Sequence, residues 1–354
     1  MKAKLYISSE NLKYNIKKIK EKIDNKEIIA MVKANAYGAG DKEIVSILES
    51  IGIKNYGVAN IEEALRVREV SQDSMILITC VSVGDEVEEA IKNDISMSVS
   101  DIDNISEIDD IASALGKQAK VHIKIDTGMT RLGFEPENID EVIGRIFEYK
   151  NIEIEGIYTH LSCADVDEEF TKSQIDIFDN IVKKMEKYVD FKYIHFLNSD
   201  GAFRYAHYNT NYTHARVGIV MYGYGYDLKP ILKLTAPVIH ITNVEKYSRV
   251  GYGGTAFVKP GEKVAVIKIG YADGLSRLLS NKILVKISKK ECRQIGNICM
   301  DMTMVDITGL DINISDEVEI FGYTNDLSEI AKLSGKIVYE VISNLGERIE
   351  RIIE

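Results

Sequence analysis

Short apolar runs alternate with amphipathic stretches over roughly the first 225 residues of the chain. Each run is four to eight residues long and rich in β-branched side chains, which is typical of strands in a parallel sheet covered on both faces. The stretches between them, such as 41–50, 61–70, 101–115 and 168–188, place apolar residues near a helical period. The eight predicted strands span residues 27–33, 56–59, 75–80, 95–99, 119–126, 152–159, 193–198 and 215–221.

Eight strand–helix units are the number that closes a (β/α)8 barrel of the TIM type, and an open doubly wound sheet is the alternative. After residue 230 the pattern changes to period-2 strands broken by Gly, Asn and Asp, with one late helix near 326–334. Pro230 and the Gly/Tyr-rich stretch 222–226 mark a boundary. We therefore expect an α/β barrel domain over 1–228 and a mainly antiparallel β domain over 229–354.

The charge balance limits the partners. Fifty-five acidic against 44 basic side chains give a formal net charge of −11, which disfavours a nucleic acid or an anionic membrane as the main partner. No stretch approaches the ~20 apolar residues that cross a bilayer, and residues 1–20 contain no signal-peptide core, so a cytoplasmic protein is expected. The four cysteines and six histidines lack the spacing of a disulfide framework or a metal site, and no metal is expected.

Residues that end the predicted barrel strands are the candidates for chemistry, because the active site of such a barrel lies at that end. Lys33 ends the first strand. A lysine buried there has a lowered pKa, as a Schiff-base enzyme requires, although a surface lysine at the strand end is the alternative. Other candidates at this rim are Lys124, Arg131, His160, Ser199, Arg216 and Gly218.

Two glycine-rich strings, at 38–40 and 223–225, begin like a dinucleotide-binding fingerprint. Neither supplies the third glycine at the required spacing or the acidic residue that binds a ribose. The chain also lacks the GxSxG turn of serine hydrolases. The sequence therefore argues against nicotinamide and serine-hydrolase chemistry.

Eight motifs together resemble the bacterial alanine racemase family, in the order expected and over nearly the whole chain. The motifs are 32–38 (VKANAYG), 124–133 (KIDTGMTRLG), 158–160 (YTH), 198–199 (NS), 216–223 (RVGIVMYG), 251–253 (GYG), 269–274 (IGYADG) and 298–301 (ICMD). The resemblance implies a barrel followed by a β domain, pyridoxal 5'-phosphate (PLP) as cofactor, and interconversion of L- and D-alanine that supplies D-alanine for peptidoglycan.

The resemblance also implies roles for individual residues. Lys33 would hold PLP covalently and act as one of two acid/base groups, and Tyr252, supplied by the partner subunit of a homodimer, would be the other. Two bases on opposite faces of a planar carbon invert its configuration. The remaining implied roles are Arg216 at the pyridine nitrogen; Tyr37, His160, Ser199, Gly218, Ile219 and Tyr339 at the cofactor; Arg131 and Met300 at the substrate; Lys124, which is often carbamylated in this family, His195 and Asp301 in support; and Asp165, Tyr271, Arg277 and Ile337 at the entrance.

Two positions bear on specificity. Asn297 replaces an arginine that the family often has at the entrance, which changes the charge of the gate. Tyr339 favours alanine, because serine-racemising relatives often lack tyrosine at this position. A serine or broad-specificity racemase on the same scaffold is the alternative. A non-catalytic PLP-binding protein is more distant, since such proteins resemble the barrel alone.

Overall fold

The computed structural model describes residues 1–322 and 327–354, and the chain divides into two compact units. The barrel unit comprises residues 13–34 and 44–221. The β unit comprises residues 1–12, 35–43 and 222–354. Among the described helices, none combines the length and the apolar character needed to cross a membrane.

The barrel unit contains one parallel eight-stranded sheet in the order β8-β7-β6-β5-β4-β3-β2-β9. Backbone hydrogen bonds from Thr213 N to Ile194 O and from Arg216 N to Leu197 O join its two ends, so the sheet closes. The barrel prediction is thereby confirmed. The strands are Glu27–Met31 (β2), Asn55–Val58 (β3), Met75–Ile78 (β4), Ser96–Val99 (β5), Ala119–Lys124 (β6), Ile152–Tyr158 (β7), Tyr193–His195 (β8) and His214–Val217 (β9).

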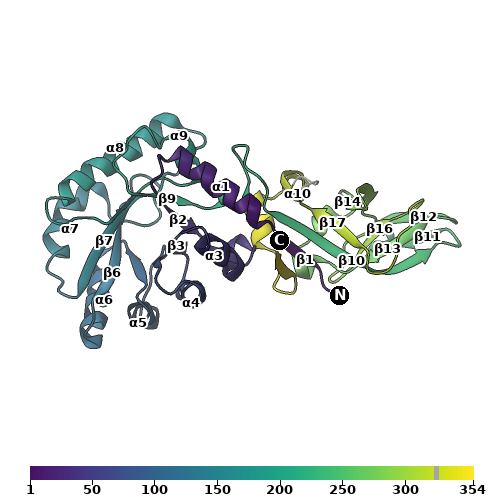
Figure 1. The fold of residues 1–354 in the computed structure, drawn as a ribbon, viewed down its shortest axis with the longest axis horizontal. Helices are drawn as coiled ribbons and strands as arrows, with labels where there is room; N and C mark the ends of the chain where they lie inside the picture. Colours follow the sequence, from purple (N-terminus) through teal and green to yellow (C-terminus); the bar gives the residue numbers. More distant parts are fainter. Residues whose placement is uncertain (323–326) are drawn as a thin grey trace. The chain divides into compact units, whose positions relative to one another are not determined.

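Helices lie outside these strands, as Figure 1 shows for α4 to α8. Side-chain caps fix where several begin: Asn60 accepts from Glu63 N, Asp101 from Asn104 N, and Asp167 from Phe170 N. The helices are Ser9–Lys22 (α1), Lys33–Tyr37 (α2), Asp41–Glu49 (α3), Ile61–Val70 (α4), Asp85–Lys92 (α5), Ile102–Leu115 (α6), Ile139–Ile146 (α7), Glu168–Met185 (α8) and Ser199–Arg204 (α9). Short 3-10 turns span Pro136–Asn138 (η1) and Ile219–Tyr222 (η2).

The β unit is built on a second eight-stranded sheet, in which β15-β14-β17-β10-β1-β18 form one path and β13 joins β10 to β16. Most pairs are antiparallel, as predicted, whereas β1 and β18 run parallel. The strands of this sheet are Lys4–Ile7 (β1), Leu232–Asn243 (β10), Lys263–Ile267 (β13), Leu284–Ile287 (β14), Lys290–Arg293 (β15), Thr303–Asp306 (β16), Glu317–Phe321 (β17) and Glu350–Ile353 (β18). Ser248–Val250 (β11) and Ala256–Val258 (β12) form a separate antiparallel pair. The turns and helices are Tyr252–Gly254 (η3), Tyr271–Asp273 (η4), Arg277–Leu279 (η5), Leu327–Ser334 (α10) and Val338–Ser343 (α11).

The start of the chain belongs to the β unit, whereas the expected division placed a single boundary at 228/229. Strand β1 pairs with β10, with Leu5 opposite Leu234, and with β18, with Leu5 opposite Arg351. These partners lie more than 220 residues away in sequence, so periodicity alone gives no sign of the pairing. The late helix expected near 326–334 is α10, and residue 326 lies outside the described residues.

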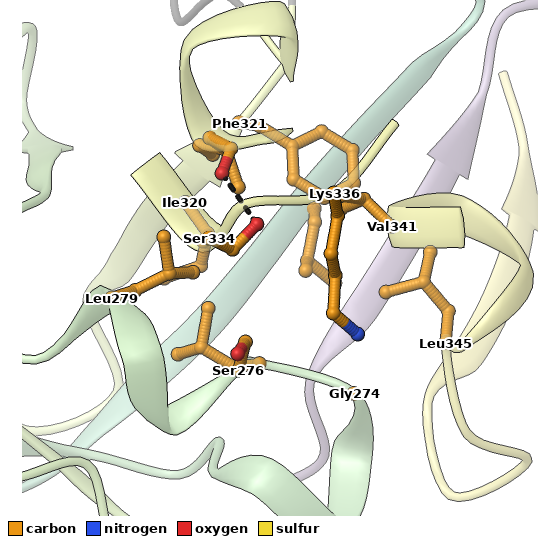
Figure 2. A pocket seen from close by; sticks show the side chains of 12 residues that line it. Gly274, Ser276, Leu279, Ile320, Phe321, Ser334, Lys336, Val341 and Leu345 are labelled. Atoms are coloured by element: carbon orange, nitrogen blue, oxygen red, sulfur yellow. Dashed lines mark hydrogen bonds between the residues drawn. The ribbon is translucent and has the colours of Figure 1, made fainter. Parts of the chain in front are cut away.

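Helices α10 and α11 pack over β10 and β17 around a small apolar cavity of about 10 Å³, which is room for about one water molecule (Figure 2). Leu279, Phe321 and Val341 are among its lining residues. The Ser334 hydroxyl, which also lines it, donates to Ile330 O one turn earlier in α10 at 2.8 Å. This packing fixes α11, the helix that carries Tyr339.

Candidate active site

Lys33 lies where β2 ends, and the chain then forms a left-handed helical turn. Ala34, Asn35, Ala36 and Tyr37 have φ angles of 53°, 53°, 51° and 54°. For residues other than glycine this conformation costs roughly 1–2 kcal/mol per residue, so the surrounding contacts must impose it. Ala34 N donates to Glu63 Oε1 at 2.7 Å, and Asn35 Oδ1 accepts from Asp41 N at 2.9 Å. The turn therefore fixes the backbone from which the Lys33 side chain projects.

The Lys33 amine is partly buried, and groups of both charge signs act on its pKa. Burial lowers its pKa below the ordinary value, and Arg131 and Arg216 lower it further, against opposing contributions from Cys80 and Glu63. A larger fraction of the amine is therefore neutral at neutral pH than in an exposed lysine. A neutral amine is the form that attacks a carbonyl carbon.

Arg216 projects from β9 into the interior and is almost completely buried. Its Nη1 donates to His195 Nδ1 at 2.8 Å and to His195 O at 2.7 Å, and its Nη2 donates to Thr159 O at 2.7 Å and to His160 Nδ1 at 3.3 Å. Burial lowers the pKa of Arg216 to about 10, so the guanidinium remains charged at neutral pH. Burial and then the charge of Arg216 lower the pKa values of His160 and His195 far below 6.5, so both imidazoles are neutral acceptors.

Lys124 ends β6 and is 5% exposed. Its Nζ donates to Ile125 O at 2.9 Å and lies 5.1 Å from the centre of the Tyr158 ring. Burial, followed by the charges of Arg216 and Arg131, lowers its pKa to about 7, while Asp126 opposes this. The amine is therefore poised between its charged and neutral forms.

The Asp126 carboxylate organises the loop that follows β6. It accepts backbone hydrogen bonds from Gly128, Met129, Thr130 and Arg131 at 2.7–3.1 Å. These bonds outweigh burial and lower the pKa of Asp126 below its ordinary value. The loop after β6 is thus folded around one carboxylate, and this sets where Arg131 leaves the backbone.

A set of donors lies after β8 and β9. Asn198 caps α9 through Gly201 N at 2.8 Å, and the Ser199 hydroxyl accepts from Gly218 N at 3.2 Å. Ile219 begins the turn η2 directly after Gly218. The first backbone N–H groups of such turns lack partners within the turn and are suited to an anion.

The β unit carries the other candidate residues. Tyr37 and Tyr339 face each other with ring centres 6.1 Å apart. Tyr252 lies on η3 between two glycines of positive φ and is 74% exposed, and Met300 is 52% exposed. The Asn297 amide donates to Tyr252 O at 2.8 Å. The residue that differs from the usual gate arginine therefore holds the backbone of the candidate base.

The remaining entrance and supporting residues are also placed. Arg348 donates to Asp301 at 2.8 Å and to Asp273 at 2.9 Å, which ties the 298–301 motif to the chain end. The barrel unit holds Lys33, Lys124, Arg131, His160, Asp165, His195, Ser199, Arg216, Gly218 and Ile219. The β unit holds Tyr37, Tyr252, Tyr271, Arg277, Met300, Asp301, Ile337 and Tyr339.

Sequence reasoning missed two residues behind Arg216. His122 Nδ1 lies 2.9 Å from His195 Nε2, and His122 Nε2 lies 3.3 Å from Glu155 Oε1. One signal was available: His122 is two residues before Lys124 on β6, so both point to the same face of the strand.

Comparisons with known proteins agree with the resemblance seen in the motifs. Residues 7–225 match the alanine racemase N-terminal domain family, and residues 231–353 match the alanine racemase C-terminal domain family. The alanine racemase of Fusobacterium nucleatum is 37% identical over 365 residues, covering both chains completely. The solved alanine racemase of Clostridium difficile 630 superposes with a TM-score of 0.93 at 32% identity, over 100% of this chain and 96% of that one.

The alanine racemase of Bartonella henselae was solved with covalently bound pyridoxal phosphate. It superposes with a TM-score of 0.86 at 28% identity and full coverage of both chains. Both halves of the chain, the motif order and the fold thus lead to one assignment. The chain belongs to the alanine racemase family.

Proposed function

We propose that this chain interconverts L- and D-alanine, with PLP held covalently by Lys33. The observation that carries the proposal is the Lys33 amine at the C-terminal end of a barrel strand, with a pKa lowered by burial and by Arg131 and Arg216. The Bartonella relative with covalently bound cofactor supports the same choice. Supply of D-alanine for peptidoglycan is the corresponding biological role.

The residues present fit PLP by their chemistry. Lys33 offers an aldehyde an amine whose pKa is lowered by burial. The four Nη protons of Arg216 are directed at His195, Thr159 and His160, so its Nε–H would be the donor for a ring nitrogen. In the barrel unit, Ser199 can donate its hydroxyl proton to a phosphate while it accepts from Gly218 N, and Ile219 begins a turn whose first N–H suits an anion. Tyr37 and Tyr339 of the β unit, with ring centres 6.1 Å apart, are the hydroxyl groups that the family resemblance adds. When bound, PLP spreads the negative charge that develops on the substrate α-carbon.

Arg216 decides how far that charge spreads. Its pKa of about 10 keeps it protonated at neutral pH, and its two neutral imidazole neighbours accept hydrogen bonds from it without removing a proton, because their pKa values lie far lower. An arginine that keeps its own proton leaves a facing pyridine nitrogen without one. Limited spread into the ring favours return of the proton to the α-carbon, and so favours racemisation over transamination.

Two residues exchange protons with the α-carbon in this proposal. Lys33 acts on one face, and Tyr252 from the partner subunit of a homodimer acts on the other. The exposure of Tyr252 and Met300, together with exposed Tyr247 and Phe257, supports an interface on the β unit. His160 orients Tyr252 in the assembled site.

Arg131 binds the substrate carboxylate, and Lys124 supports it. A neutral Lys124 amine can form an N–C bond to CO2 and release one proton to solvent, which gives a carbamate anion able to pair with Arg131. The lowered pKa of about 7 supplies the neutral amine that this addition needs.

Three measurements test the proposal. The purified protein supplied with PLP should absorb near the visible edge, and borohydride should abolish that band and fix the cofactor mass to the peptide containing Lys33. Lys33→Ala should lose racemase activity, whereas Lys42→Ala, on the adjoining helix, should keep it. Turnover of L-alanine should exceed that of L-serine and L-lysine. A colourless protein, or faster turnover of serine or lysine, would overturn the assignment.

A further inference from the structure

A line of hydrogen-bonded side chains runs through the barrel interior from Arg216. Arg216 Nη1 contacts His195 Nδ1 at 2.8 Å, His195 Nε2 contacts His122 Nδ1 at 2.9 Å, and His122 Nε2 contacts Glu155 Oε1 at 3.3 Å. The side chains come from four strands, β9, β8, β6 and β7. Both histidines have no exposed surface, and Glu155 is buried. The bonds that join Arg216, His195 and His122 are therefore shielded from bulk water, whereas Glu155 also lines an open pocket of about 330 Å³.

The direction of every bond in this line follows from its two ends. Arginine only donates, so His195 Nδ1 must accept, and a neutral His195 then carries its proton on Nε2. That proton points to His122 Nδ1, which must accept in turn. A neutral His122 therefore carries its proton on Nε2 and donates it to the Glu155 carboxylate, which only accepts when ionised.

The charge state of each member agrees with this order. Burial lowers the pKa values of His122 and His195, so both rings are neutral. The bonds from His122 and Ser96 outweigh burial and lower the pKa of Glu155, so the carboxylate is ionised. The charge of Lys120 also lowers the pKa of Glu155, and the charge of Lys192 lowers the pKa of His122. Lys120 itself forms an ion pair with Asp94 at 2.6 Å.

The barrel packing makes room for this arrangement. A Cβ at Gly156 would lie 2.5 Å from His122 Nδ1, so the absence of a side chain admits the ring. Tyr193 stacks on His122 with centres 5.1 Å apart, and Tyr158 stacks on His195 at 4.8 Å and 12°. These stacking contacts hold the orientation of both imidazole rings. The hydrogen bonds at the two ends of the line then decide which ring nitrogen carries the proton.

We infer that Glu155 and His122 are positioning residues: through His195 they fix the tautomer that accepts from Arg216, and so hold the guanidinium that faces the cofactor ring. This role rests on the proposed function, whereas the tautomers exist without any cofactor. Without the Glu155 carboxylate as acceptor, a share of His122 could carry its proton on Nδ1. The matching share of His195 would then carry its proton on Nδ1, opposite the Arg216 N–H, and Arg216 alone would oppose this change.

Nitrogen-15 NMR of the six histidines in the full-length protein tests the inference before any cofactor is added. Assignment uses single substitutions of each histidine. We expect His122 and His195 to be neutral with the proton on Nε2. Glu155→Leu should move both toward the Nδ1–H form, and Glu155→Gln, whose amide oxygen can still accept, should retain the native tautomers. Glu153→Leu, an exposed site on the same strand, is the matched control.

The PLP-loaded protein supplies the second readout. Glu155→Leu should lower kcat for alanine by about 10-fold, as loss of an outer partner does at other sites, with little change in KM, and should raise the share of turnovers that end in transamination. Glu155→Gln should restore both. A wild-type His195 with its proton on Nδ1, or a Glu155→Leu protein identical to Glu153→Leu in tautomers and kcat, would overturn the inference. Since the wild-type tautomers are measured without any Glu155 variant, a misfolded Glu155→Leu protein leaves that part of the test intact. If His122 and His195 carry their protons on Nε2 but the protein binds no PLP, the proposed function is contradicted and the tautomer assignment stands.

Discussion

Replacement of Lys124 by methionine should stabilise the protein, and the gain should depend on pH. Methionine has a similar length and no charge. The Lys124 pKa falls from its ordinary 10.5 to about 7 because the amine is buried beside Arg216 and Arg131. Each pKa unit corresponds to about 1.4 kcal/mol, so keeping this amine charged costs the folded chain roughly 5 kcal/mol below pH 7. Loss of the bond to Ile125 O offsets about 1 kcal/mol of the gain.

The sign of the pH dependence follows from proton binding. Between pH 7 and 10.5 the unfolded chain holds a proton on Lys124 that the folded chain has released, so wild-type stability rises with pH in this window. The advantage of Lys124→Met is therefore largest below pH 7 and should shrink by about 1.4 kcal/mol per pH unit above it. Urea unfolding at fixed protein concentration, from pH 6 to 10, measures the difference.

Lys120→Met provides the control on the same strand. Lys120 pairs with Asp94 and has a raised pKa, so its contribution should be constant from pH 6 to 9. Added bicarbonate should narrow the gap between Lys124→Met and wild type at pH 8, since CO2 adds to the neutral amine of the folded chain and a ligand of the folded state stabilises it. A stability gap for Lys124→Met that stays constant from pH 6 to 10 would show that the amine titrates normally, and would refute the reasoning.

Three further predictions follow from the site. Tyr252→Phe should slow washout of the α-deuterium from one alanine enantiomer by ~10²-fold or more, and equal slowing of both enantiomers would contradict the two-base assignment. Asn297→Ala removes the 2.8 Å bond to Tyr252 O and should lower kcat about 5-fold in steady-state assays. Asn297→Asp also lacks the N–H donor and should lower kcat by the same factor. An Asn297→Asp protein with wild-type kcat would count against this role of Asn297. Ala34→Gly should raise the free energy of unfolding, measured in urea, by up to about 1 kcal/mol because Ala34 has a φ of 53°. Ala114→Gly in the right-handed helix α6 should lower this free energy by a similar amount. If both substitutions change the free energy of unfolding in the same direction, the turn is not strained.

Local patterns in the sequence were sufficient for the architecture. The eight apolar runs and the helical periods between them predicted the closed barrel, and the change to period 2 after residue 230 predicted the second sheet. Helix 61–70 was predicted with the bounds it has in the structure, since its apolar spacing is a local signal. Lys33 could be named as a candidate for the same reason, because a strand and the residue that follows it are adjacent in the chain.

Tertiary structure decided what depends on distant partners. Strand β1 joins the β unit through β10 and β18, which no local period records. The left-handed turn after Lys33 contains two alanines, which have no intrinsic preference for it, so contacts such as that of Glu63 impose it.

The line from Arg216 to Glu155 likewise needs four strands to be brought together. A sequence specifies periods and strand ends because they arise between neighbouring residues. It leaves pKa values, tautomers and strain open, because these are set by burial and by charges that only the folded barrel brings within a few ångströms of one another.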